Sequence, residues 1–135
     1  MDIKTHDLCI GAMEEERIQP ILEEYFNTTL TKTEDGHYMD FRDIDGDYYE
    51  IKSRGHPYGT FPTTMISQHK LKFCKTNPEY NHWFIFAFTN GDYIYKYNKD
   101  DRILFGIGGR KDRGKDETQV YCYIPIELLK KIQDN

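Results

Sequence analysis

The sequence predicts an α/β domain in which helices flank a mixed β-sheet, formed by the whole chain of residues 1–135. Three observations lead to this prediction. Residues 8–26 repeat apolar side chains at helical spacing, and residues 38–54 alternate in character as the two strands of a hairpin do. Residues 82–88, HWFIFAF, form a short apolar and aromatic run that is typical of a central strand buried on both faces.

The composition is that of a folded protein, with 38% hydrophobic and 15% aromatic residues. No stretch is long and apolar enough to span a membrane, and the start lacks the basic and apolar regions of a signal peptide. We therefore expect an intracellular, cytoplasmic protein without membrane attachment. Three widely spaced cysteines predict buried or half-buried free thiols, neither a disulfide framework nor a zinc site.

The first helix is predicted over residues 8–26. Pro20 lies inside this stretch and predicts a kink, or a break followed by a restart. Glu14 and Glu15 each share a helical face with apolar residues, so at least one of them approaches the core side. The apolar stripe consists of Ile10, Met13, Ile18, Ile21, Leu22, Tyr25 and Phe26. A polar connection over residues 27–35 follows, with strand potential at residues 28–31.

The hairpin of residues 38–54 has strands at 38–43 and 48–53, and Asp45-Gly46 supplies its turn. A two-residue loop would mix apolar and acidic side chains on each face. A three-residue loop of residues 44–46, with Gly46 in the left-handed conformation, places Asp40 opposite Glu50. We predict this second register because it separates the two classes. The core face then carries Met39, Phe41, Tyr49 and Ile51, and the other face carries Tyr38, Asp40, Arg42, Tyr48, Glu50 and Lys52.

The second register gathers two carboxylates and an ammonium group on one patch of sheet. Opposed residues have Cβ atoms about 4.5–5.5 Å apart, so Asp40 and Glu50 repel each other unless a positive or neutral group lies between them. Mg²⁺ binds one or two carboxylates and completes its shell with water and phosphate oxygens. Lys52 on the same face would steady a water or offset charge on a phosphate. The alternative is a hairpin face of ordinary solvated charges, which the flanking apolar residues disfavour.

The rest of the chain predicts a helix, several strands and a final helix. A loop at residues 55–62 leads to a helix with Ser67 as N-cap, ending near Lys75. The strand at 82–88 turns at Asn90-Gly91 into a strand at 93–97. Shorter strands are predicted within residues 102–109 and at 120–124, and a C-terminal helix from Pro125 to about Ile132.

The net charge of −5 does not indicate nucleic-acid binding, but the cations are clustered in the sequence. Both clusters are candidates for phosphate contact, although clusters of charged residues usually form only a solvent-exposed surface. One cluster contains Lys52, Arg54, His56, His69, Lys70, Lys72 and Lys75. The other contains Arg110, Lys111, Arg113 and Lys115.

The order of these elements resembles the PD-(D/E)XK nuclease superfamily, whose members have a restriction-endonuclease-like core. In that family a helix with a Glu precedes a hairpin with an Asp on one strand and Glu-x-Lys on the next. Here Asp40, Glu50 and Lys52 match the hairpin motif, and Glu15 matches the helical Glu better than Glu14 does. Met39 stands where the family name has Pro, a position that is commonly substituted. The resemblance covers about residues 11–88, and the size is similar to that of small phage, viral and archaeal members, including Holliday junction resolvases.

The resemblance implies a Mg²⁺-dependent deoxyribonuclease, with Mn²⁺ as a substitute. Asp40, Glu50, Glu15 and the main-chain carbonyl of Ile51 would hold the metal, and Lys52 would orient the attacking water or stabilise the transition state. Gln68 or Lys70 would fill the auxiliary position at the start of the following helix. The implied contacts to DNA phosphates are Arg54, His56, Lys70, Arg110, Lys111, Arg113 and Lys115.

Two other functions fit the same fold. One is a catalytically silent nucleic-acid-binding module, which metal binding would distinguish, and the other is a nuclease fold that serves protein assembly. Cleavage of both strands would favour a homodimer. A viral source would extend the expected location to the nucleus or the virion. The sequence leaves open the form of the DNA substrate and the number of metal ions.

Overall fold

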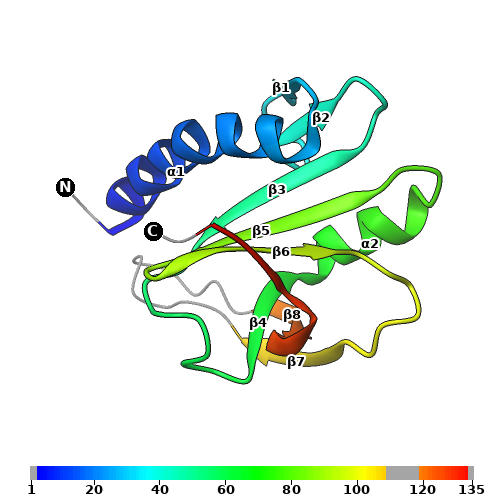
Figure 1. Cartoon of the computed structure of the whole chain (residues 1–135). Coiled ribbons are helices and arrows are strands. Elements are labelled where there is room, and N and C mark those ends of the chain that lie inside the picture. The colour runs from blue at the N-terminus through cyan, green and yellow to red at the C-terminus, as the bar shows by residue number, and fades with distance from the viewer. Residues whose placement is uncertain (1–2, 109–118, 134–135) are drawn as a thin grey trace.

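A computed structural model describes residues 3–108 and 119–133 of the chain (Figure 1). It confirms the predicted α/β fold with a mixed sheet. The largest sheet has the strand order β1-β2-β3-β5-β6-β9, and a second sheet has the order β4-β8-β7. The elements are α1 (Ile3–Phe26), β1 (Leu30–Lys32), β2 (Phe41–Asp43), β3 (Tyr48–Ser53), β4 (Thr63–Ser67), α2 (Gln68–Thr76), β5 (His82–Phe88), β6 (Gly91–Lys96), β7 (Leu104–Gly108), β8 (Gln119–Pro125), a short 3-10 helix (Ile126–Leu128) and β9 (Lys130–Gln133).

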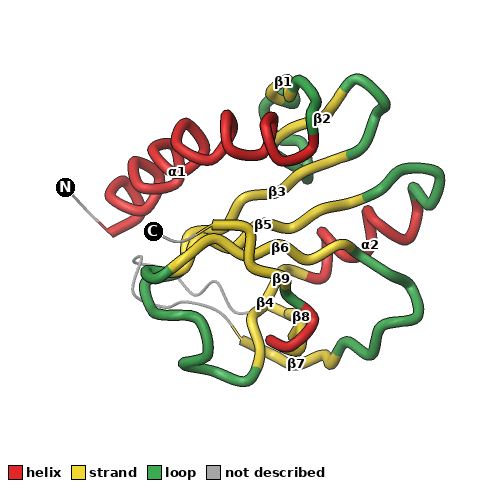
Figure 2. The backbone as a smooth tube through the Cα atoms, viewed as in Figure 1, coloured by secondary structure: helices red, strands yellow, loops and turns green. Residues whose placement is uncertain are grey.

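The large sheet is covered on both faces. Helix α1 lies along one face, while α2 and the second sheet lie on the other side (Figures 1 and 2). Ile18 and Leu22 of α1 pack with Tyr49 and Ile85 in one core cluster. A second cluster packs α2 and β8 against the opposite face of β5. The central strand β5 is therefore buried on both sides, as the sequence predicts, and it pairs in parallel with β3.

Helix α1 runs through Pro20 as one element, so the predicted break is wrong. The side chains of Pro20 and Glu16 are both exposed. The carbonyl of Glu16 loses its usual amide partner at Pro20 and can bind water instead at this exposed position. The helix can therefore continue while its other side packs on the sheet.

The hairpin has the predicted register. Phe41 lies opposite Tyr49 and Arg42 opposite Tyr48, and the Asp43 amide donates to the Asp47 carbonyl at 3.0 Å. The loop therefore has three residues, 44–46, and Gly46 takes a φ of 93° that favours glycine. A Cβ at Gly46 would also lie 2.8 Å from the Tyr80 ring, so this turn requires glycine for two reasons.

The first strand of the hairpin is shorter than predicted, because β2 begins only at Phe41. Side chains bind the main chain before it: the Thr33 hydroxyl donates to the Met39 carbonyl, and His37 Nδ1 accepts the Met39 amide at 2.9 Å. Strict alternation fails in this bend. Met39 is buried with Tyr48 in the cluster beside α2, so the prediction that it shares a face with Phe41 is wrong.

Three predictions after the hairpin are corrected. Strand β4 was missed; it pairs with β8, more than fifty positions away, in the register Met65 opposite Tyr123. The turn after β5 has Thr89-Asn90 at its centre, because Gly91 already pairs with Phe88. The predicted C-terminal helix is a single 3-10 turn followed by β9, which pairs with β6. A strand here supplies partners for backbone groups of β6 that would otherwise lie at an open edge.

The cysteines carry no disulfide in the described residues. Cys74 and Cys122 are buried as predicted, but Cys9 is exposed, so the prediction for Cys9 is wrong. Of the helices in the described ranges, none has the length and apolar character needed to cross a membrane.

Candidate active site

Asp40 lies beside β3 at the point where β2 begins. Its amide donates to the Tyr49 carbonyl at 2.9 Å, and its Oδ2 accepts the Ile51 amide at 2.8 Å. These two bonds fix the Asp40 carboxylate against the backbone between Glu50 and Lys52. The N–H and C=O of one strand residue point to the same side, so the Ile51 carbonyl also faces the Asp40 side of β3.

Glu50 is the buried carboxylate of the site, with only 2% of its surface exposed. Burial raises the pKa of Glu50 well above its usual range, and the neighbouring Asp40 carboxylate raises it further through a hydrogen bond and charge repulsion. Lys70 and Lys52 lower it by a smaller amount. Its Oε2 accepts no hydrogen bond of regular geometry, although Lys70 Nζ lies 2.5 Å away in an ion pair.

Two lysines reach Glu50 from different elements. Lys52 Nζ lies 3.9 Å from Glu50 Oε2, and 41% of the Lys52 side chain is exposed. Lys70 comes from the first turn of α2, pairs with the same oxygen and also donates to the Tyr38 carbonyl. With 19% of its side chain exposed, Lys70 is enclosed, whereas Lys52 projects toward solvent.

Glu15 is the acid of α1 that interacts with this group. Burial raises the pKa of Glu15, the charge of Asp40 raises it further, and Lys32 and Lys52 lower it. Its carboxylate lies 3.8 Å from Lys32 Nζ of β1, a pairing that the sequence did not predict. Glu14 instead pairs with Arg17 at 2.7 Å. Glu14 is thus engaged by Arg17, while Glu15 lies near enough to Asp40 for its pKa to respond to that charge.

The donor set suits a hard divalent cation. Asp40, Glu50 and the Ile51 carbonyl all supply oxygen, the ligand that Mg²⁺ prefers, and the buried Oε2 of Glu50 lacks a regular hydrogen bond. Among residues 3–108 and 119–133, no three His, Cys, Asp or Glu side chains lie close enough together to form a metal site by themselves. A metal here would therefore use Asp40, Glu50 and the backbone.

The side chain of Arg54, an expected phosphate contact, is held by hydrogen bonds within the protein. It donates to the Thr64 hydroxyl at 3.0 Å and to the Met65 carbonyl at 2.5 Å, and its guanidinium lies over the Phe86 ring. Burial lowers the pKa of Arg54 to about 10. These bonds link β3 to β4 and favour a structural role for Arg54.

The remaining predicted site residues are two phosphate-contact groups and the auxiliary residue Gln68. His56 packs against Phe61 and Phe88, and its pKa is lowered first by burial and then by Arg54, so it adds little positive charge at neutral pH. Gln68 is exposed at the first position of α2. The four cations Arg110, Lys111, Arg113 and Lys115 lie outside the described residues.

The α/β core is that of a PD-(D/E)XK nuclease-like protein, and Asp40, Glu50 and Lys52 lie together on it. A model of the family described as phage putative PDDEXK endonuclease matches residues 10–132, and the chain belongs to this family. Neither a curated protein nor a solved structure matches the chain.

The raised pKa of Glu50 predicts a cost in stability. Glu50 binds its proton more tightly in the folded chain, so stability falls as the pH rises from 4.5 through the raised pKa. In EDTA we expect Glu50→Gln to raise the unfolding midpoint at about pH 9 but not at about pH 4. Thermal unfolding of both proteins measures this. The exposed Glu127→Gln is the matched control, and an equal gain from Glu50→Gln at both pH values would contradict the prediction.

Proposed function

We propose that this protein is an endodeoxyribonuclease that hydrolyses phosphodiester bonds with a divalent cation, Mg²⁺ or Mn²⁺. One observation carries the proposal: the Ile51 amide holds Asp40 next to the strand that carries Glu50 and Lys52, and Lys52 Nζ lies 3.9 Å from Glu50. Membership of a family described as phage endonucleases supports it independently.

Asp40, Glu50 and the Ile51 carbonyl would hold the cation, with Glu15 as a direct or water-mediated ligand. When bound, Mg²⁺ supplies polarisation of a phosphoryl oxygen and a lowered pKa of the attacking water. The bond from the Ile51 amide keeps Asp40 in place before a metal arrives, so this part of the site is preorganised.

Lys52 is the residue that would act on the reacting phosphate. Its side chain is more exposed than that of Lys70 and lies on the same side of β3 as Glu50. It would orient the attacking water or stabilise negative charge that develops on the phosphate. Lys70 is held by Glu50 and the Tyr38 carbonyl, which suits a residue that positions Glu50.

A cleavage assay tests the proposed function. Purified protein is incubated with supercoiled, linear, single-stranded and branched DNA in Mg²⁺, Mn²⁺ or EDTA. We expect nicking that requires the divalent cation. Binding of DNA without cleavage of any substrate would instead identify a silent nucleic-acid-binding module. Light scattering of the same preparation measures whether the protein is the homodimer that cutting both strands would favour.

The four cations of residues 110–115 are proposed to contact DNA phosphates. A dication bound at Asp40 and Glu50 would add positive charge beside Lys52, so we expect Ca²⁺ to strengthen binding without cleavage. Affinity should fall with salt at a slope of about −0.9 per phosphate contacted on duplex DNA. Replacing Arg110, Lys111, Arg113 and Lys115 by Ala should flatten this slope in fluorescence anisotropy. An identical slope would show that these cations are only a solvated surface.

A further inference from the structure

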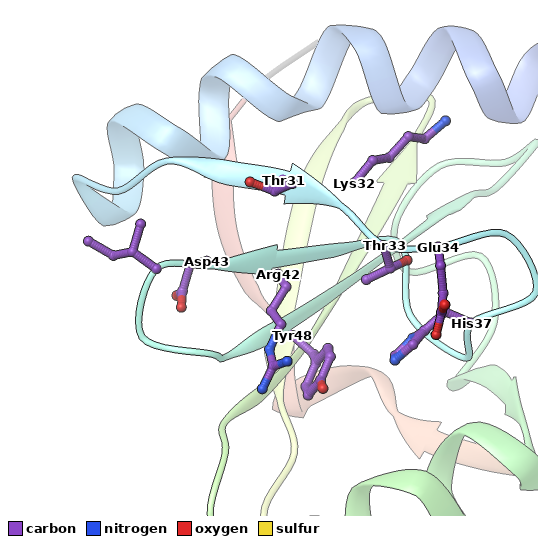
Figure 3. A pocket seen from close by; sticks show the side chains of 9 residues that line it. Thr31, Lys32, Thr33, Glu34, His37, Arg42, Asp43 and Tyr48 are labelled. Carbon is purple, nitrogen blue, oxygen red and sulfur yellow. The ribbon is translucent and has the colours of Figure 1, made fainter.

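A cavity of about 440 Å³ lies next to the candidate active site, and none of the proposed catalytic or phosphate-contacting residues lines it. The cavity adjoins that site through Thr33 of its lining, whose amide donates to the Asp40 carbonyl at 2.9 Å. Figure 3 shows Arg42, Tyr48 and His37 gathered on one side of β2, while Lys32 points toward α1. The lining residues are Thr31, Lys32, Thr33, Glu34, His37, Arg42, Asp43, Ile44 and Tyr48.

Arg42 is held rigidly in the cavity wall. Its guanidinium carbon lies 4.7 Å from the centre of the Tyr48 ring and 4.8 Å from that of the Tyr80 ring, and its Nε donates to the Gly46 carbonyl at 3.1 Å. Within the described part of the chain, its two Nη groups have no hydrogen-bond partner. Arg42 therefore presents an oriented pair of donors, which suits an acceptor pair on a planar ligand.

His37 provides a further donor. Its Nδ1 accepts the Met39 amide at 2.9 Å, so the neutral ring carries its proton on Nε2. The ring stacks on Tyr48, with centroids 5.2 Å apart and an interplanar angle of 20°. The Met39 bond and the Tyr48 contact fix the direction in which the His37 donor points.

The lining has two basic side chains, Lys32 and Arg42, and two acidic ones, Glu34 and Asp43, so it carries no net formal charge. The Asp43 carboxylate accepts the amides of residues 45 and 47 and the Tyr49 hydroxyl, so its acceptors are largely used. Glu34 is exposed, and its carboxylate has no hydrogen bond among the described residues. A neutral cavity with both donors and acceptors suits a nucleobase better than a bare phosphate.

We propose that this cavity binds one unpaired nucleobase of the nucleic-acid strand, and that guanine fits it best. Arginine pairs with the O6 and N7 acceptors of guanine through two parallel hydrogen bonds. Glu34 lies on the other side of Tyr48 from Arg42 in Figure 3, where it would accept from N1–H and the 2-amino group. Adenine presents an amino donor in place of O6 and would meet the Arg42 donors unfavourably. The proposal deepens the proposed function, on which it rests.

A titration with free nucleotides tests the cavity without cleavage. Guanosine and adenosine 5′-monophosphates are added to the metal-free protein in EDTA, and amide chemical shifts are followed by NMR. We expect guanosine monophosphate to shift residues 31–48 and to bind about tenfold more tightly than adenosine monophosphate. Arg42→Lys and Glu34→Gln should each remove this preference. Arg102→Lys, at an exposed arginine, should retain it.

Glu34→Gln changes an exposed side chain, so it keeps the test decisive even where Arg42→Lys disturbs folding. Equal affinity for the two nucleotides, or shifts confined to residues outside the cavity, would overturn the proposal. Nicking of DNA without the guanine preference would sink the cavity proposal and leave the nuclease standing. A guanine preference without nicking would support the cavity proposal and reject the proposed nuclease activity.

Discussion

Lys52→Ala is expected to slow DNA nicking by at least about 10²-fold, as the loss of one charge-stabilising donor at a reacting centre does. The same variant should bind Mn²⁺ as the unmodified protein does, because its ammonium lies 3.9 Å from Glu50 and would not ligate the metal. A nicking assay and isothermal titration with Mn²⁺ measure the two properties separately. Unchanged nicking by this variant would reject the proposed role of Lys52.

Three further variants make this result specific. Asp40→Asn should lose Mn²⁺ binding and nicking together, while its amide oxygen can still accept the Ile51 amide and preserve the hairpin. Lys72→Ala changes an exposed lysine of α2 and should leave both properties unchanged. Lys70→Ala tests which lysine acts: a larger loss of nicking than with Lys52→Ala would assign the direct role to Lys70.

The hairpin could be predicted from the sequence because its signals are local. Asp45-Gly46 fixes the turn, and only one loop length puts Phe41, Tyr49 and Ile51 on one face, where all three are buried. The same register brings Asp40 to Glu50. The burial of Glu50 was not predicted, because it depends on α2, which supplies Lys70 to this carboxylate and lies outside the hairpin.

Interactions between distant segments account for the errors. The side chains of His37 and Thr33 bind the main chain of Met39, so the direction of the Met39 side chain does not obey the alternation of a strand. Residues 130–133 form a strand because the edge of β6 is available to them. The local sequence of residues 125–132 does not reveal this partner. The ion pair of Lys70 with Glu50 likewise depends on how α2 sits against β3, although the predicted N-cap at Ser67 placed Lys70 correctly in the first turn.

The contact between α1 and the β5–β6 hairpin depends on a charge pair that the sequence analysis did not identify. Arg17 donates to both oxygens of Asp92, at 2.9 and 2.7 Å, and also to Glu14. Asp92 is completely buried, whereas 34% of the Arg17 side chain is exposed. The bonds to Asp92, followed by those to Glu14, raise the pKa of Arg17 above its already high value, so the Arg17 guanidinium stays charged at any ordinary pH.

Arg17→Met is therefore expected to lower the free energy of unfolding by about 3 kcal/mol, because it leaves the buried Asp92 carboxylate without its partner. Chemical denaturation in EDTA measures the change independently of cleavage. Adding Asp92→Leu to Arg17→Met should recover much of the loss, since an uncharged pair carries no unpaired buried charge. Lys32→Met removes the cation that pairs with Glu15. Because the Lys32 side chain is 67% exposed, this change should lower the free energy of unfolding by less than about 1 kcal/mol. Equal losses for Arg17→Met and Lys32→Met would show that the Arg17–Asp92 pair contributes no more than a surface ion pair.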